Sequence, residues 1–211
     1  MRLKLTSETF ADLAIIPPRC AFAEPDFVSH IRLSANRNPH LAWSGVPAGT
    51  HSLALICHDP DVPSRGDDVN QEGRTITASL PRVDFFHWAL VDLSPFDGPI
   101  QEGEFSAAVT AKGKPGPQAP RGTRQGLNDY TKWFAGDKAM AGDYFGYDGP
   151  CPPWNDSIVH HYMFTLYALN IRQCPVAGRF TGPDVLAAIE GRILESAVLT
   201  GKYSLNLAVP A

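Results

Sequence analysis

Three short stretches of the sequence concentrate side chains that could bind an anion or carry a proton. The first, Cys57–Ser64, reads CHDPDVPS and follows an apolar run. Its two prolines fix the backbone and disfavour a helical conformation for the residue before each of them. The stretch therefore predicts a stiff loop that holds the carboxylate of Asp59 in a set position. The alternative is an Asp-Pro turn in which this carboxylate caps its own backbone.

The second stretch places a single histidine in the apolar run Phe85–Val91. Such a histidine is either a hydrogen-bonded core residue or a donor that faces a ligand. Side chains alternate along a strand. The sequence therefore predicts one face with Phe85, His87 and Ala89, and another with Phe86, Trp88 and Leu90.

The third stretch joins a turn rich in glycine and proline, Gly146–Pro153, to the run His160–Tyr167. Alternation puts His160, Tyr162, Phe164 and Leu166 on one face, and His161, Met163, Thr165 and Tyr167 on the other. An imidazole and a phenol would then lie side by side, and both can donate hydrogen bonds to an oxyanion. The backbone of the turn could approach a ligand closely because glycine has no side chain. The alternative is a turn that simply leads into a core strand.

The elements that must position these residues are mainly β-strands. The 19 prolines and 18 glycines are spread throughout, with short apolar runs between them. No regular alternation of strands and helices indicates a doubly wound sheet. The predicted strands are Arg2–Leu5, Phe27–Leu33, Ser52–Cys57, Phe85–Val91, His160–Leu169 and Tyr203–Val209.

One region predicts helix. Thr181 and Asp184 have the spacing of a capping box, and apolar residues follow at near-helical spacing. We expect Gly191 to split this region into two short helices and Gly201 to end it. The apolar residues of this pattern are Val185, Leu186, Ile189, Ile193 and Leu194.

Composition limits the classes of function. The 211 residues fit a single domain spanning 1–211, and a net charge of −4 argues against a nucleic-acid partner. No apolar run reaches the roughly 20 residues of a membrane span, and the polar residues within 1–16 argue against a signal peptide, so a cytoplasmic location is expected. The widely spaced cysteines Cys20, Cys57, Cys151 and Cys174 are expected to be thiols, although a disulfide stays open. No cofactor or metal site is predicted.

A long segment, residues 111–147, is rich in glycine, proline and charge. Irregular stretches of this length are often functional, although a surface excursion is the alternative. Its cations either line the rim of a pocket or form a solvated face. They are Lys112, Lys114, Arg121, Arg124 and Lys132.

Together these motifs resemble the phosphatidylethanolamine-binding protein family, which includes the Raf kinase inhibitor proteins, and look closest to its bacterial branch. The resemblance covers about residues 41–203, whereas residues 20–38 match poorly. Many relatives have His-Arg-Tyr where this chain has His160-His161-Tyr162. The matching stretches are Leu41–Thr50, Asp59–Ser64, Phe86–Trp88, Gly126–Tyr130, Gly146–Pro153 and His160–Leu169.

The resemblance implies a Greek-key fold of a large and a small antiparallel sheet with a few peripheral helices. It also implies a pocket for a small anion such as phosphate or a phosphorylated headgroup, and bacterial relatives suggest a homodimer. We further expect Asp59 to orient one of the histidines and raise its pKa, so that an imidazolium faces the anion. The implied pocket residues are Asp59, His87, His160, Tyr162, Gly149 with the adjoining Pro150 and Cys151, and Pro63 at the rim.

Three classes of function remain open from the sequence. The first is a binding protein for an anion or phospholipid headgroup, with a regulatory role like that of the Raf kinase inhibitors. The second is an enzyme that hydrolyses phosphoryl or ester groups with a His/Asp cluster of His58, Asp59, Asp61, His87, His160 and His161, although no known catalytic motif is present. The third is an inhibitor whose unknown protein partner contacts the pocket rim.

Overall fold

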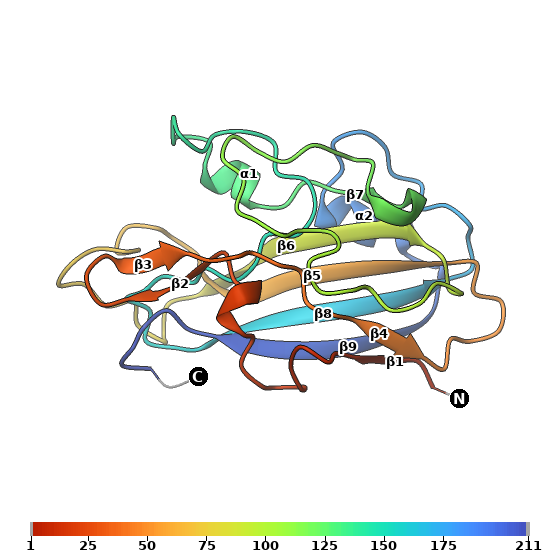
Figure 1. Cartoon of the computed structure of the whole chain (residues 1–211), viewed down its shortest axis with the longest axis horizontal. Coiled ribbons are helices and arrows are strands. Elements are labelled where there is room, and N and C mark those ends of the chain that lie inside the picture. Colours follow the sequence, from red (N-terminus) through yellow and green to blue (C-terminus); the bar gives the residue numbers. More distant parts are fainter. Residues whose placement is uncertain (1, 210–211) are drawn as a thin grey trace.

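Antiparallel strands dominate the computed structural model, which describes residues 2–209. The large sheet has the strand order β7-β6-β5-β8-β9, so β8 returns to lie beside β5 after a long excursion (Figure 1). Two small antiparallel pairs, β1–β4 and β2–β3, flank it. The mainly β prediction is therefore confirmed. The strands are β1 (Lys4–Thr6), β2 (Ala23–Asp26), β3 (His30–Leu33), β4 (Ala42–Ser44), β5 (Ser52–Pro63), β6 (Arg82–Leu93), β7 (Arg124–Gln125), β8 (His160–Leu169) and β9 (Ile193–Tyr203).

Helices are few and short. They are the 3-10 turns η1 (Pro18–Cys20) and η2 (Pro120–Gly122) and the helices α1 (Tyr130–Trp133) and α2 (Gly182–Ile189). The predicted capping box is confirmed at α2, where the Thr181 N–H donates to the Asp184 carboxylate at 2.8 Å. None of the helices formed by residues 2–209 is long and apolar enough to span a membrane.

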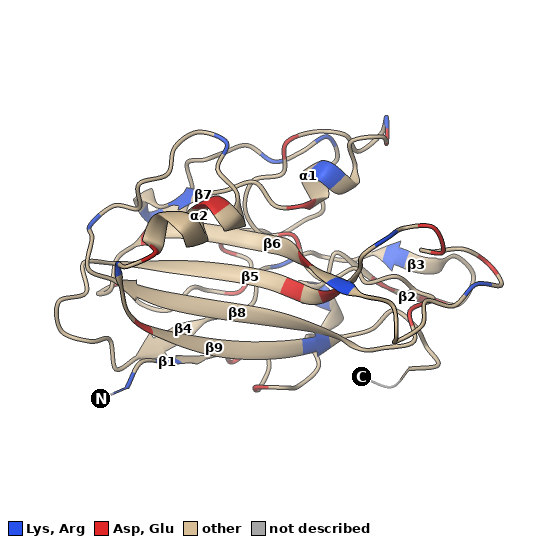
Figure 2. Cartoon of the chain, turned by 180° about the vertical axis from the view of Figure 1, so that it is seen from behind, with Lys and Arg blue, Asp and Glu red and all other residues tan. Residues whose placement is uncertain are grey.

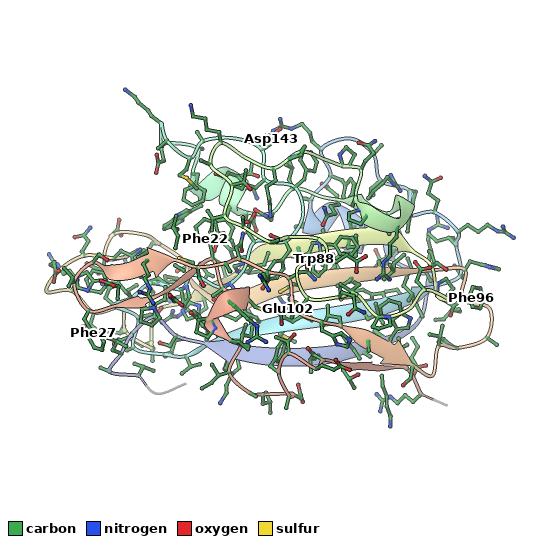
Figure 3. The ribbon with its side chains drawn as sticks, in the orientation of Figure 1. Phe22, Phe27, Trp88, Phe96, Glu102 and Asp143 are labelled. Atoms are coloured by element: carbon green, nitrogen blue, oxygen red, sulfur yellow. The ribbon has the colours of Figure 1, made fainter. Side chains whose placement is uncertain are left out.

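The large sheet separates two apolar clusters. The larger cluster contains Trp88, Leu55 and Phe164, and Figure 3 shows Trp88 against the sheet. On the opposite face, α2 packs against β6 (Figure 2). In that view lysine, arginine, aspartate and glutamate residues are interspersed over the loops. All four cysteines are free thiols, as expected.

Three predicted elements are wrong. The second helix, with Ile193 and Leu194, is replaced by β9, and of the predicted strand Tyr203–Val209 only Tyr203 is in a strand, since residues 204–209 form a loop with turns. Gly191 adopts a positive φ of 72° between the helix and this strand, so the chain leaves the helical path there. Gly201 lies inside β9 against Ile16 and Phe10 rather than ending a helix.

Candidate functional site

A cavity of about 460 Å³ opens where β5, β6 and β8 meet the β2–β3 hairpin and the segment around α1. Most of its lining is apolar or aromatic. Figure 3 shows Phe22, and its ring stacks on that of Tyr130 with 4.6 Å between centroids. The lining consists of Phe22, Ile31, Leu33, Asp59, Val62, Pro63, Ser64, Arg65, Gly66, Val69, Asn70, Phe85, His87, Tyr130, Trp133, Phe134, Met140, Cys151, Pro152, Pro153 and Tyr162.

Two irregularities in the pairing of β5 with β6 aim the polar residues at this cavity. The register passes from Cys57↔Trp88 to His58↔Phe86, which leaves His87 without an opposite residue. This β-bulge turns His87 and Trp88 toward the same side of the sheet, as bulges beside binding sites often do. The predicted alternation, with His87 and Ala89 sharing a face, is therefore wrong because Ala89 belongs to the opposite cluster.

The second irregularity follows Asp59. The pairing passes from Asp59↔Phe85 to Val62↔Val83, so β5 carries one extra residue there. The predicted loop at Cys57–Ser64 is thus mostly strand, because β5 continues to Pro63. The alternative prediction, an Asp59 carboxylate that caps its own backbone, is also met. Oδ1 of Asp59 accepts the Asp61 N–H at 2.7 Å. The prolines and this cap fix the carboxylate at the cavity floor.

A buried chain of charged side chains runs from Asp59 in the cavity lining to Arg82 at the start of β6. Oδ2 of Asp59 accepts from Nδ1 of His160 at 2.7 Å, and Nε2 of His160 donates to Asp156 at 3.1 Å. Asp156 in turn accepts two hydrogen bonds from Arg82, at 2.5 and 3.1 Å. Each ring nitrogen of His160 faces an acceptor, so the ring is an imidazolium. Burial opposes its charge, but the two carboxylates outweigh burial and raise the pKa of His160 to about 9.

His87 has the opposite electrostatic character. Its Nδ1 donates to the backbone carbonyl of Asp148 at 2.7 Å, which fixes the tautomer because a carbonyl can only accept. Burial lowers the pKa of His87, although the charge of Asp59 partly offsets this. Nε2 forms no hydrogen bond with any residue in the range 2–209, so the neutral ring presents a lone pair to the cavity.

The backbone carbonyl that orients His87 is itself fixed by a buried polar cluster around Asp148. The Asp148 carboxylate accepts from Asn36 and Asn128, each at 2.7 Å, and pairs with Lys114 at 3.0 Å. The Asn36 side chain also accepts the Gly149 N–H at 2.8 Å. A Cβ at Gly149 would lie 2.1 Å from the Cys20 carbonyl oxygen, so only glycine fits there.

Tyr162 supplies the last polar group of the floor. Its side chain is 1% exposed, and its hydroxyl lies beside Asp59 but meets hydrogen-bond geometry with no residue in the range 2–209. Burial and then the charge of Asp59 raise its pKa well above the ordinary value, so the hydroxyl keeps its proton. A buried hydroxyl without a partner costs free energy, and a bound ligand would remove that cost.

Of the pocket residues predicted from the sequence, five line the cavity: Asp59, Pro63, His87, Cys151 and Tyr162. Three support it from behind. His160 orients Asp59, the Gly149 carbonyl accepts from the Tyr130 hydroxyl at 2.8 Å, and the Pro150 carbonyl accepts the Phe22 N–H at 2.9 Å. The expectation that Asp59 raises the pKa of a histidine holds for His160, but that imidazolium lies outside the cavity lining.

Sequence reasoning missed the aromatic wall. Tyr130, Trp133 and Phe134 come from the segment 111–147, together with Met140. Their i, i+3, i+4 spacing is that of one helix face and could have indicated this wall. The buried ion pairs Arg82–Asp156 and Lys114–Asp148 left no comparable signal, because the two partners of each pair are far apart in the sequence.

The cations of the segment 111–147 do not line the cavity. Lys114 is buried against Asp148, Arg121 pairs with Glu104, Arg124 with Asp92, and Lys132 with Asp129. The cation within the lining is Arg65, from the loop after β5.

The remaining members of the proposed His/Asp cluster point elsewhere. Nδ1 of His161 donates to the Asp61 carboxylate at 2.8 Å, and neither residue lines the cavity. His58 also lies outside the lining and stacks against Phe86. The six residues of the cluster are therefore not gathered in one place.

Comparison with known proteins identifies the family of this arrangement. A UPF0098 protein from Methanothermobacter thermautotrophicus is 34% identical over 170 residues, which cover 80% of this chain and 83% of that protein. Escherichia coli YbhB is 30% identical over 169 residues, covering 80% and 82%. A solved structure of a putative phosphatidylethanolamine-binding protein homologue from Chlamydia trachomatis superposes with a TM-score of 0.64 at 27% identity, covering 96% of this chain and 97% of that chain.

Escherichia coli YbcL, whose structure is described as that of a new member of the mammalian PEBP family, has the same fold, with a TM-score of 0.67, 24% identity and coverage of 97% and 99%. The family model "Phosphatidylethanolamine-binding protein" matches residues 6–204, which include all three stretches that form the cavity floor. The chain therefore belongs to the phosphatidylethanolamine-binding protein family.

Proposed function

We propose that this protein binds a small amphipathic ligand, with a phosphate-type anionic group at the cavity floor and an apolar portion against the aromatic wall. The observation that carries the proposal is the unpartnered hydroxyl of Tyr162, a buried polar group in the lining of an otherwise largely apolar cavity. Pockets of this kind, with apolar walls and few convergent polar groups, are typical ligand sites. The family's description as phosphatidylethanolamine-binding supports the same ligand class.

The charges near the floor are compatible with a single negative charge on the ligand. Asp59 and Asp156 are balanced by His160 and Arg82, and Asp148 is balanced by Lys114. Arg65 lies in the lining, is exposed and forms no ion pair with residues 2–209, so it adds an unbalanced positive charge to the cavity wall.

We expect Tyr162→Phe to weaken the binding of butyl phosphate by about tenfold, because the variant removes the buried donor. Stability should be unchanged or slightly higher, since the hydroxyl has no partner to lose. Titration calorimetry measures the affinity. The matched control is Tyr167→Phe, on the same strand but packed against the cluster on the other face. If Tyr162→Phe binds as tightly as the wild type, the hydroxyl does not contact the ligand.

The apolar wall predicts that affinity rises with chain length. Each buried methylene contributes roughly 0.8 kcal/mol, so butyl phosphate should bind at least about tenfold more tightly than methyl phosphate. Trp133→Ala should reduce this difference, whereas Phe96→Ala, an exposed aromatic outside the lining, should not. Equal affinities for the two phosphates would contradict the amphipathic ligand.

A further inference from the structure

The floor of the cavity presents hydrogen-bond acceptors rather than donors. Asp59 is an ionised carboxylate, because both of its oxygens accept hydrogen bonds, one from the imidazolium of His160 and one from the Asp61 N–H. An ionised carboxylate has about four lone-pair sites, so some of them stay free to accept from a ligand. Asp59 lines the cavity, which directs this acceptor capacity toward the occupant.

His87 adds a second acceptor. Because Nδ1 donates to the Asp148 carbonyl, a neutral ring carries its lone pair on Nε2. Burial lowers the pKa of His87 and so favours this neutral form. The donor at the floor is then the hydroxyl of Tyr162.

A fully deprotonated oxyanion offers only acceptors and would meet two acceptors here. A carboxylate and an oxyanion that face each other without a proton between them repel, and both lose hydration. An oxyanion that keeps one acidic hydrogen removes this conflict, because its O–H can donate to an acceptor while its other oxygens accept from Tyr162.

We propose that the cavity selects a protonated oxyanion, a phosphate monoester or phosphonate monoanion whose P–OH donates to Asp59 or to Nε2 of His87. This inference rests on the proposed function and narrows its ligand class. Sulfate esters are expected to bind more weakly because they carry no acidic hydrogen. Phosphodiester headgroups are disfavoured for the same reason, so a monoester is favoured over a diacyl phospholipid headgroup.

Phenyl phosphate and phenyl sulfate provide a matched pair. At pH 5.5 both are mostly monoanions of similar shape, since the second phosphate pKa is about 6, and they differ in the acidic hydrogen. We expect calorimetry on the wild-type protein to show at least about tenfold tighter binding of phenyl phosphate. Its affinity should fall as the pH rises from 5.5 to 7.5, while that of phenyl sulfate should not follow the same curve.

Titratable groups of the protein that face the ligand could add to this pH dependence. The lining contains Asp59, His87, Tyr130, Tyr162, Cys151 and Arg65, with His160, Asp148 and Asp129 behind it. Burial raises the pKa of Cys151 to about 12 and raises those of Tyr130 and Tyr162 well above the ordinary value. Phenyl sulfate does not titrate between pH 5.5 and 7.5, so any pH dependence of its affinity reports these protein groups, and the difference between the two probes reports the ligand proton.

A second pair distinguishes the sources of the phosphate group. Glycerol 3-phosphate is a monoester, and glycerophosphoethanolamine is the diester headgroup of a lipid with the same glycerol phosphate. We expect the monoester to bind more tightly at pH 5.5. Tighter binding of the diester would overturn the inference, because the ammonium group and not an acidic hydrogen would then supply the donor.

Variants test the acceptor directly. Asp59→Asn should abolish most of the preference for phenyl phosphate, because the amide can donate to a sulfate oxygen, whereas Tyr162→Phe should weaken both probes by a similar factor. If Asp59→Asn fails to fold, the wild-type comparison still decides. Equal binding of phosphate and sulfate overturns this inference and leaves the proposed function intact, whereas binding of no probe overturns both.

Discussion

Between pH 6.5 and 9 the free energy of unfolding is expected to fall by about 2.5 kcal/mol, because the proton that His160 retains on folding is progressively lost over this range. The pKa of His160 is raised from 6.5 to about 9 in the folded protein, where the ring lies between Asp59 and Asp156. A raised folded pKa stabilises the protein fully below the unfolded pKa of 6.5. This contribution is then lost as the pH rises through 9. Chemical denaturation at half-unit pH steps measures the loss.

The control for this prediction is His160→Gln, which removes the titrating ring. This variant should be less stable than the wild type at pH 6.5, because Asp59 and Asp156 lose their shared cation. Its stability should change much less between pH 6.5 and 9. The difference between the pH profiles of the two proteins therefore separates the contribution of His160 from that of the cysteine thiols. Parallel pH profiles for the two proteins would show that the buried ring is not an imidazolium.

The sequence predicted the parts of the fold that local patterns encode. The run His160–Leu169 is a strand with the predicted faces, because Tyr162, Phe164 and Leu166 all pack in the larger cluster. The capping box at Thr181 and Asp184 begins α2 as predicted. In each case the pattern depends on residues within one turn or one strand, where periodicity and capping chemistry apply.

The errors lie where two distant segments decide the outcome. Residues 193–203 form β9 rather than helix because they pair with β8 along its length, and the apolar spacing alone fits both states. The orientation of His87 depends on a bulge against β5, which no property of the run Phe85–Val91 reveals.

The candidate site shows the same division. The motifs indicated Asp59, His87 and Tyr162, which do converge on the cavity, yet the groups that set their protonation are remote. The tautomer of His87 is fixed by the Asp148 carbonyl, and the charge of Asp59 is balanced through His160. Residue types at a motif therefore predicted which groups meet, but not which of them donate and which accept.

Asp148→Asn is expected to have the largest effect on stability, a loss of about 3–5 kcal/mol in the free energy of unfolding. The carboxylate accepts from the amides of Asn36 and Asn128 and pairs with Lys114. An asparagine at this position would turn an NH₂ group toward one of these donors and leave the buried ammonium group of Lys114 without its counter-charge. Burial already lowers the pKa of Lys114, and loss of the Asp148 charge would lower it further.

A double variant separates the two causes of this loss of stability, which are the unpaired charge of Lys114 and the lost acceptor for the two asparagines. Adding Lys114→Met to Asp148→Asn removes the uncompensated buried charge, so it should restore part of the stability lost in the single variant. Ligand affinity should remain reduced in both, because the carbonyl that orients His87 belongs to the disturbed residue. If the double variant is no more stable than Asp148→Asn, the lost stability comes from the hydrogen bonds of Asn36 and Asn128 and not from the charge of Lys114. Unchanged stability in Asp148→Asn would show that the cluster does not hold the turn behind the cavity, and the orientation of His87 would need another cause.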